Sequence, residues 1–304
     1  MKILRFNDER VGVLVDGKGV VDVSEAISYR EEKGPQRVMQ QVIEEWDATF
    51  RAQFESLAAS GDGVPLESVT LLNPIPQPRK VLAAFANYLD TPERKPDDIP
   101  LEFFYKSPET VGPGGEVHLL DIAPVYVFQP EAEIAFVIGN HAKNVSIENA
   151  YDHIFGYCPF VDISARGMTR RTQFLPKGQD TFALVGPWIT TRDEVGDPHT
   201  LNVKSWVNGG ARQDYSTSAM ARKIPEQLSW ASRFLQLQGG DIITTGTYHV
   251  GLGPINDGDV FEIEIEKLGR TSWTIKSDGP RKDPEFRPGV TQIPNATPGF
   301  SRVD

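Results

Sequence analysis

The chain has 304 residues, of which 39% are hydrophobic and 24% charged, and its formal net charge is −11. This length allows one large domain with a smaller one, and the composition is typical of a globular protein without a bilayer-spanning segment. The negative charge disfavours nucleic acid and membrane surfaces as partners. Small-molecule chemistry is therefore the expected function, and an anionic substrate would need local positive charge or a metal ion.

Two features of the sequence predict a cytoplasmic location. Cys158 is the single cysteine, so no internal disulfide can form and a reducing compartment is expected. The first residues, MKILRFNDERVGVLV, carry charges where a signal peptide has an apolar block.

Residues 1–70 are predicted to form a small separate unit. The alternation in VGVLVDGKGVVDV predicts a hairpin that turns at Asp16 and Gly17, because Asp-Gly adopts the positive φ angles of tight turns. After Pro35, apolar side chains recur at helical spacing, which predicts one long amphipathic helix or two shorter ones. The side chains expected to face the core are Val38, Met39, Val42, Ile43, Trp46, Phe50, Phe54 and Leu57.

Three prolines in LLNPIPQPRK, residues 71–80, predict a domain boundary, since this segment can neither continue a helix nor lie inside a sheet. Residues 71–277 alternate short strand-like runs with turns, and only two helices are expected, after Ser146 and at Pro225. The prediction is a mainly β domain of the α+β class, without the βαβ rhythm or GxGxxG of a nucleotide fold. Residues 278–304 are a proline-rich tail, expected to be extended or partly disordered.

The segment QPEAEIAFVIG places Glu131 and Glu133 before an uncharged run. On a strand, residues two apart project from the same face, so these carboxylates would lie side by side. A solvent-facing strand edge would explain the pair, and so would a cation or basic partners that offset the two charges. Asp162, between apolar neighbours in GYCPFVDISARGM, adds a third carboxylate. Three carboxylates without clustered Cys or His favour Mg²⁺, Mn²⁺ or Ca²⁺ over zinc.

Six blocks follow one another as in the fumarylacetoacetate hydrolase family: EAEIAFVIG, GYCPFVDISAR, KGQDTFALVGPWI, VNGGARQDYST, GGDIITTGTYHVGLG and GDVFEIEIEKLG. Their order and spacing resemble the family over roughly residues 71–270. The resemblance implies a β-roll of packed mixed sheets, often preceded by a small N-terminal β domain. It also implies a metal-dependent enzyme, commonly a dimer, that acts on a small anionic 2-oxo or 1,3-dicarbonyl acid.

Position by position, the resemblance makes Glu131, Glu133 and Asp162 the metal ligands, with Mg²⁺ as the first choice of cofactor. It places Lys177 and Thr247 beside the substrate and Lys106 at the edge of the same pocket. These lysines would offset the negative charge that three carboxylates and one divalent cation leave. The remaining candidates for substrate binding are Arg166, Tyr88 and His249. Three of the basic candidates also have an explanation without a functional role: Lys177 as a solvated loop lysine, Arg166 as a structural ion-pair partner, and His249 as a turn histidine.

The sequence departs from the family at the residues that usually activate water. Hydrolases of the family usually read NYADHxxE, whereas this chain reads NYLDTPER. Thr91 stands at the histidine position, Arg94 at the glutamate position, and Glu93 lies one residue early. Thr91 cannot act as a general base near neutral pH. Three further departures are Gly167 in place of an aspartate, Thr169 in place of a pocket glutamine, and TGTYHVG in place of the TGTP turn, which introduces His249.

A proton-transfer group must then come from another residue. The candidates are Asp90, Glu93, Lys106, Lys177 and His249, with Lys177 the first choice and Glu93 the second. Carbon–carbon bond hydrolysis and lyase chemistry on an enolate (decarboxylation, tautomerisation or dehydration) both stay open, and the family favours catabolism of aromatic compounds or sugar acids. The alternative is a non-catalytic relative that binds a metal and a small acid.

Overall fold

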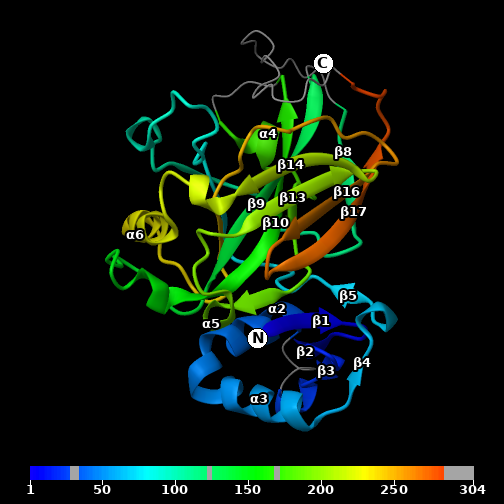
Figure 1. Cartoon of the computed structure of the whole chain (residues 1–304), viewed down its shortest axis with the longest axis vertical. Helices are drawn as coiled ribbons and strands as arrows, with labels where there is room; N and C mark the ends of the chain where they lie inside the picture. The colour runs from blue at the N-terminus through cyan, green and yellow to red at the C-terminus, as the bar shows by residue number, and fades with distance from the viewer. Residues whose placement is uncertain (28–33, 122–124, 168–171, 284–304) are drawn as a thin grey trace.

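The computed structural model describes residues 1–27, 34–121, 125–167 and 172–283 (Figure 1). Within these residues the strands form one sheet of 12 strands and one of 5 strands. Each sheet is mixed, because the parallel pairs β15–β6 and β17–β8 lie among antiparallel neighbours. The predicted mainly β fold of packed mixed sheets is therefore confirmed. Thr169 and residues 284–304 of the predicted tail lie outside the described residues.

The large sheet has the order β4-β3-β2-β1-β12-β10-β9-β15-β6-β7, with β5 paired to β1 and β11 paired to β10. Its strands are β1 (Lys2–Phe6), β2 (Arg10–Val15), β3 (Gly19–Asp22), β4 (Gly63–Val64), β5 (Leu71–Leu72), β6 (Val81–Ala84), β7 (Phe103–Tyr105), β9 (Val127–Ile138), β10 (Ile154–Arg166), β11 (Ala183–Val185), β12 (Ile189–Thr191) and β15 (Ile242–Thr244). The small sheet has the order β14-β13-β16-β17-β8. Its strands are β8 (Glu116–Leu119), β13 (Asn202–Val207), β14 (Gly210–Ser216), β16 (Val260–Ile265) and β17 (Gly269–Ser277).

The two longest strands, β9 and β10, pair in antiparallel fashion at the centre of the large sheet. Every residue of β9 is buried, and alternate side chains reach different parts of the core. Ala132, Ile134, Phe136 and Ile138 pack in the main hydrophobic cluster, whereas Ala135 and Val137 pack with N-terminal side chains such as Ile3, Met39 and Phe54. Glu131 and Glu133 therefore share the face of Ala135 and Val137, further towards the start of the strand.

The N-terminal strands join the large sheet. The predicted hairpin is present, with Val15 paired to Gly19 and Gly17 at a φ of 76°. Strand β1 then pairs with β12 through Lys2 and Thr190, which was not predicted, because periodicity locates strands without identifying their partners. The blue segment nonetheless occupies one end of the molecule (Figure 1). The predicted domain boundary after residue 70 stays a prediction.

The predicted helical segments form, with one exception. The amphipathic segment after Pro35 forms α2 (Pro35–Glu44) and α3 (Arg51–Ser60), joined by a π-helical turn (Trp46–Phe50), and α6 spans Ile224–Phe234. Two short α-helices that were not predicted also form within the described residues, α4 (Phe174–Lys177) and α5 (Arg192–Val195). The helix predicted after Ser146 is wrong. Only a 3-10 turn forms (Ala150–His153), because β10 pairs with β9 from Ile154 onwards and leaves too few residues for a helix.

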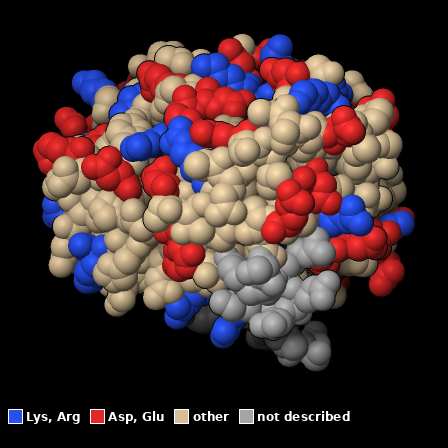
Figure 2. Space-filling model, turned by 90° about the horizontal axis from the view of Figure 1, so that it is seen from below, with Lys and Arg blue, Asp and Glu red and all other residues tan. Residues whose placement is uncertain are grey.

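Among the described residues, none of the helices combines the length and apolar character that a membrane crossing requires. On the face seen in Figure 2, acidic and basic side chains are interspersed.

Candidate metal centre

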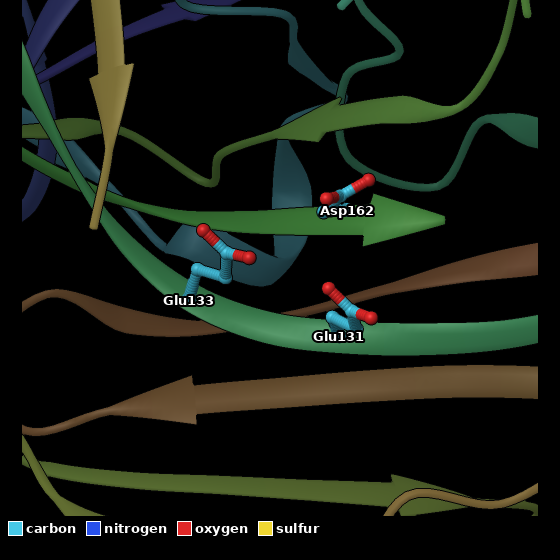
Figure 3. A group of neighbouring side chains, drawn as sticks. All are labelled: Glu131, Glu133 and Asp162. Carbon is cyan, nitrogen blue, oxygen red and sulfur yellow. The ribbon is translucent and has the colours of Figure 1, made fainter. Parts of the chain in front are cut away.

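Three carboxylates meet where β9 and β10 pair. Asp162 on β10 lies directly opposite Glu131 on β9, and Glu133 lies one pleat further along. The three side chains point into the same space (Figure 3), and one oxygen from each lies within 4.8 Å of the others. The residues are only 4%, 1% and 1% exposed, so the solvent-edge explanation of the Glu-x-Glu pair does not hold. The predicted ligand set is therefore brought together.

Basic side chains surround two of these carboxylates. The Lys177 ammonium donates to Glu131 Oε2 and to Asp162 Oδ2, at 2.7 Å each. Lys106 donates to Asp162 Oδ1 at 2.5 Å, and the Arg166 guanidinium pairs with Glu131. Lys106 and Lys177 are buried, so neither is a solvated loop lysine. Buried charges of both signs stabilise one another here, and removing one partner would leave the other uncompensated.

Glu133 is the least compensated of the three carboxylates. Its Oε2 accepts a hydrogen bond from the Gly246 amide at 2.9 Å, and within the described residues no cationic side chain pairs with it. Burial, together with the charges of Asp162 and Glu131, raises the pKa of Glu133 well above its ordinary value. Burial alone would also raise the pKa of Glu131, but Lys177 and Arg166 outweigh it and hold that pKa low.

The donor set fits a hard divalent cation. Three buried carboxylate oxygens can replace part of the water shell of Mg²⁺, Mn²⁺ or Ca²⁺, and a cation beside Glu133 would offset the charge that protein groups leave unpaired. The ammonium groups of Lys106 and Lys177 would stay beside the ligands. Each ammonium has three N–H bonds, of which two have acceptors among the described residues, so each can donate one more to a bound anion.

Thr247 and Tyr88 lie close to the carboxylates but contact protein groups. The Thr247 hydroxyl donates to the carbonyl of Ala132, between the two glutamates, at 2.7 Å. Tyr88 is fully buried with its ring edge against Tyr215, and burial raises the pKa of its hydroxyl. The Thr247 hydrogen bond supports the strand that carries the ligands, and Tyr88 packs against Tyr215, whose hydroxyl donates to the same Ala132 carbonyl. Direct substrate binding by either residue stays a prediction.

The proposed proton-transfer residues occupy three different places. Lys106 and Lys177 touch the carboxylates, whereas Glu93 is exposed, and no contact among the described residues links it to them. Asp90 and His249 form a hydrogen bond with each other, at 2.5 Å between Oδ2 and Nδ1. Arg94, which stands at the family's glutamate position, donates to the other oxygen of Asp90 at 2.7 Å.

Sequence reasoning did not single out Gln213 on β14. Its buried side chain donates to Thr247 Oγ1 at 2.8 Å and to the Tyr248 carbonyl at 2.6 Å, and accepts from the Ala132 amide at 3.0 Å. It ties the small sheet to the ligand strand and to the loop after β15. A polar residue on a strand gives no signal that it will be buried, so only the tertiary structure reveals this role.

Comparison with known proteins agrees with this geometry. Residues 80–276 match the family model described as fumarylacetoacetate (FAA) hydrolase C-terminal. The chain is 34% identical to a maleylpyruvate hydrolase of Aquipseudomonas alcaligenes, over 91% of this chain and 100% of that one. It is 31% identical to a mitochondrial oxaloacetate tautomerase of Xenopus laevis, over 90% and 89%. The crystal structure of maleylpyruvate hydrolase from Sphingobium sp. SYK-6 in complex with manganese (II) ion and pyruvate superimposes with a TM-score of 0.80 at 33% identity, covering 91% of this chain and 99% of that one.

Proposed function

Because the chain belongs to the fumarylacetoacetate hydrolase family, we propose that it is a divalent-metal-dependent hydrolase of acylpyruvates, which releases pyruvate and a second carboxylic acid. The observation that carries this proposal is the buried cluster of Glu131, Glu133 and Asp162 with basic side chains around it. Two relatives support the proposal: the Aquipseudomonas alcaligenes protein named maleylpyruvate hydrolase, and the Sphingobium maleylpyruvate hydrolase whose crystal structure is a complex with manganese (II) ion and pyruvate.

Glu131, Glu133 and Asp162 would hold the metal. A divalent cation there supplies Lewis acidity, which favours negative charge on the 2-oxo oxygen of a substrate. The free N–H bonds of Lys106 and Lys177 would donate to the substrate's carboxylate, and the burial of both lysines excludes water that would compete for it. Mg²⁺ is the proposed cofactor, with Mn²⁺ and Ca²⁺ compatible with the same donors.

The charge of the site favours a substrate with two negative charges. Three carboxylates, three cationic side chains and one divalent cation leave two positive charges, which a dicarboxylate such as maleylpyruvate would neutralise. Acetylpyruvate, with one carboxylate, would leave one of them uncompensated. We therefore expect a dicarboxylate acylpyruvate to be the better substrate.

Tautomerisation of oxaloacetate is a second candidate. Two observations favour this activity. The Xenopus relative is named as an oxaloacetate tautomerase, and in the segment NYLDTPER Thr91 and Arg94 stand where hydrolases of the family have the water-activating histidine and glutamate. Tautomerisation moves a proton between a carbon atom and an oxygen atom of one 2-oxo acid, so it needs no attacking water.

A substrate panel followed by proton NMR tests the proposal. Purified protein with Mg²⁺, with Mn²⁺ or with EDTA is given maleylpyruvate, acetylpyruvate, oxaloacetate and 2-oxo-3-deoxy sugar acids. We expect metal-dependent release of pyruvate, with kcat/KM for maleylpyruvate at least ~10-fold above that for acetylpyruvate, about 1.4 kcal/mol in the barrier. Accelerated enol–keto exchange of oxaloacetate without cleavage of either acylpyruvate would favour the second candidate. Metal-independent turnover, or turnover of none of these acids, would contradict both.

A further inference from the structure

We propose that His249 is the catalytic proton-transfer residue of this site and that Asp90 is its positioning residue. The pair is assembled by the sheet topology. Strands β6 and β15 are parallel neighbours, with Val81 opposite Ile242 and Ala83 opposite Thr244. Chains leaving two parallel strands emerge from the same edge of the sheet, so the segments that follow them meet. Asp90 lies in the segment after β6 and His249 in the segment after β15.

Hydrogen bonds hold these two segments together. The Asn87 side chain donates to the Thr245 carbonyl at 2.9 Å, which fixes the backbone four residues before His249. His249 Nδ1 lies 2.5 Å from Asp90 Oδ2, and Arg94 donates to Asp90 Oδ1 at 2.7 Å. Burial by itself would raise the pKa of Asp90, but His249 and Arg94 outweigh it and lower that pKa. An ionised carboxylate only accepts hydrogen bonds, so Nδ1 carries the hydrogen and Nε2 of the neutral ring keeps its lone pair.

The histidine loop is also tied to the ligand strand. Thr247, two residues before His249, donates to the carbonyl of Ala132, and Ala132 separates Glu131 from Glu133. Gln213 reinforces this tie through the Tyr248 carbonyl and the Ala132 amide. These hydrogen bonds hold the segment that carries His249 against the ligand strand, and the His249 side chain is 19% exposed and so accessible to a small ligand.

The pair of His249 and Asp90 can replace the water-activating pair that the segment NYLDTPER lacks. Thr91 has no basic group, and Arg94, at the expected glutamate position, instead fixes Asp90. The acid now lies one residue before Thr91, and the imidazole comes from a different loop. The sequence favours Lys177 as the base, but in the structure its ammonium bridges Glu131 and Asp162, which suits a fixed positive charge better than a base.

The inference rests on the proposed function, because it assigns the base of that reaction. His249 Nε2 takes a proton from water as the water oxygen bonds to the distal carbonyl carbon of the acylpyruvate. The bond between that carbon and the methylene carbon breaks, and its electron pair leaves with the enolate of pyruvate. The proton on Nε2 then passes to the methylene carbon, which gives pyruvate, while the other product keeps the second water proton as a carboxylic acid.

The test compares His249→Gln, Asp90→Asn and a control, His118→Gln, in the Mg²⁺-loaded full chain with maleylpyruvate and oxaloacetate. His118 is 65% exposed on β8 in the small sheet, so its replacement should leave kcat unchanged. We expect kcat to fall at least ~100-fold for His249→Gln, the lower end of what a positioned base supplies, and at least ~10-fold for Asp90→Asn, with KM altered less. Mn²⁺ affinity, measured by electron paramagnetic resonance, should stay within about 3-fold of wild type, because neither residue is a proposed ligand.

A second readout does not depend on turnover. In ¹⁵N NMR spectra of the metal-free wild type, the His249 ring should be the tautomer protonated on Nδ1, and Asp90→Asn should shift it towards the tautomer protonated on Nε2. If the wild type turns over substrate and the kcat of His249→Gln lies within about 3-fold of the wild-type kcat, the role of His249 is overturned and the proposed function stands. An unchanged tautomer in Asp90→Asn would overturn the role of Asp90. A wild type that binds Mn²⁺ but transforms neither acid would overturn the proposed function and, with it, the assignment of a base.

Discussion

Asp162 lies directly opposite Glu131 across the β9–β10 pair, and the Lys177 ammonium lies 2.7 Å from an oxygen of each. Like charges directly opposite each other on a sheet are destabilising, and burial increases the cost. The Lys177 ammonium lies between the two carboxylates and offsets this cost. One oxygen of each, together with one of Glu133, lies within 4.8 Å of the others, in the space shown in Figure 3.

Replacing Lys177 should reduce turnover severely. Lys177→Met removes the bridging charge, so we expect kcat on maleylpyruvate to fall at least ~100-fold, in the range of a lost charged contact in the transition state. Lys204→Met is the matched control, since that lysine is 44% exposed on β13 and pairs weakly with Asp214. Steady-state kinetics of the two variants makes the comparison. Equal kcat for Lys177→Met and Lys204→Met would show that the bridging charge is not used in the reaction.

Thr91→Ala should have a small effect. Thr91 replaces the histidine expected in the family, and the contact seen for it is from the Arg94 amide to its backbone carbonyl, which alanine retains. We expect kcat to change by less than ~10-fold, about 1.4 kcal/mol in the barrier. If Thr91→Ala lost more activity than Lys177→Met, the threonine hydroxyl would have to orient the nucleophile or the substrate.

The contribution of Asp90 to stability should depend on pH. The folded-state pKa of this carboxyl is lowered below 3.8, so its stabilisation is present above that value and is lost as the pH falls through the folded-state pKa. Loss of a charge-assisted hydrogen bond costs about 1.5 kcal/mol, which lowers Tm by roughly 2–4 °C in a chain of this size near pH 6. Thermal unfolding of wild type and Asp90→Asn should show this gap shrinking below about pH 4. A gap that is constant or grows in acid would contradict the ionic character of the Asp90 contacts.

Cys158 should be unreactive in the native protein. It is fully buried on β10 opposite Ala135, and burial raises the pKa of its thiol to about 12. Because the thiolate is the reactive form, Ellman's reagent should label the native protein only as fast as β10 opens, and should label one thiol at once in denaturant. Rapid labelling of the native protein near neutral pH would show that the pairing of β10 with β9 is looser than described.

The ligand set could be predicted from the sequence, because period-two alternation places Glu131 and Glu133 on one strand face and a family motif marks Asp162. The hairpin at Gly17 and the helix at Pro225 were equally local signals. The pairing of Asp90 with His249 could not be predicted, since it depends on the parallel register of β6 and β15, strands about 160 residues apart in the chain. The helix predicted after Ser146 does not form because of a non-local contact as well: the pairing of β10 with β9, which begins at Ile154, overrode the local capping signal.

Mn²⁺ binding to the purified chain tests the central claim most directly. Isothermal titration with and without oxalate, a non-reacting mimic of a 2-oxo acid, should show one Mn²⁺ per wild-type chain. Glu133→Gln should weaken binding at least ~100-fold without lowering the Tm of the metal-free protein, because it removes a buried charge that protein groups leave unpaired. Glu55→Gln, an exposed glutamate on α3, should bind as wild type does. Absence of Mn²⁺ binding by the wild type in the presence of oxalate, or equal binding by Glu133→Gln, would contradict the assignment of the three carboxylates as a metal centre.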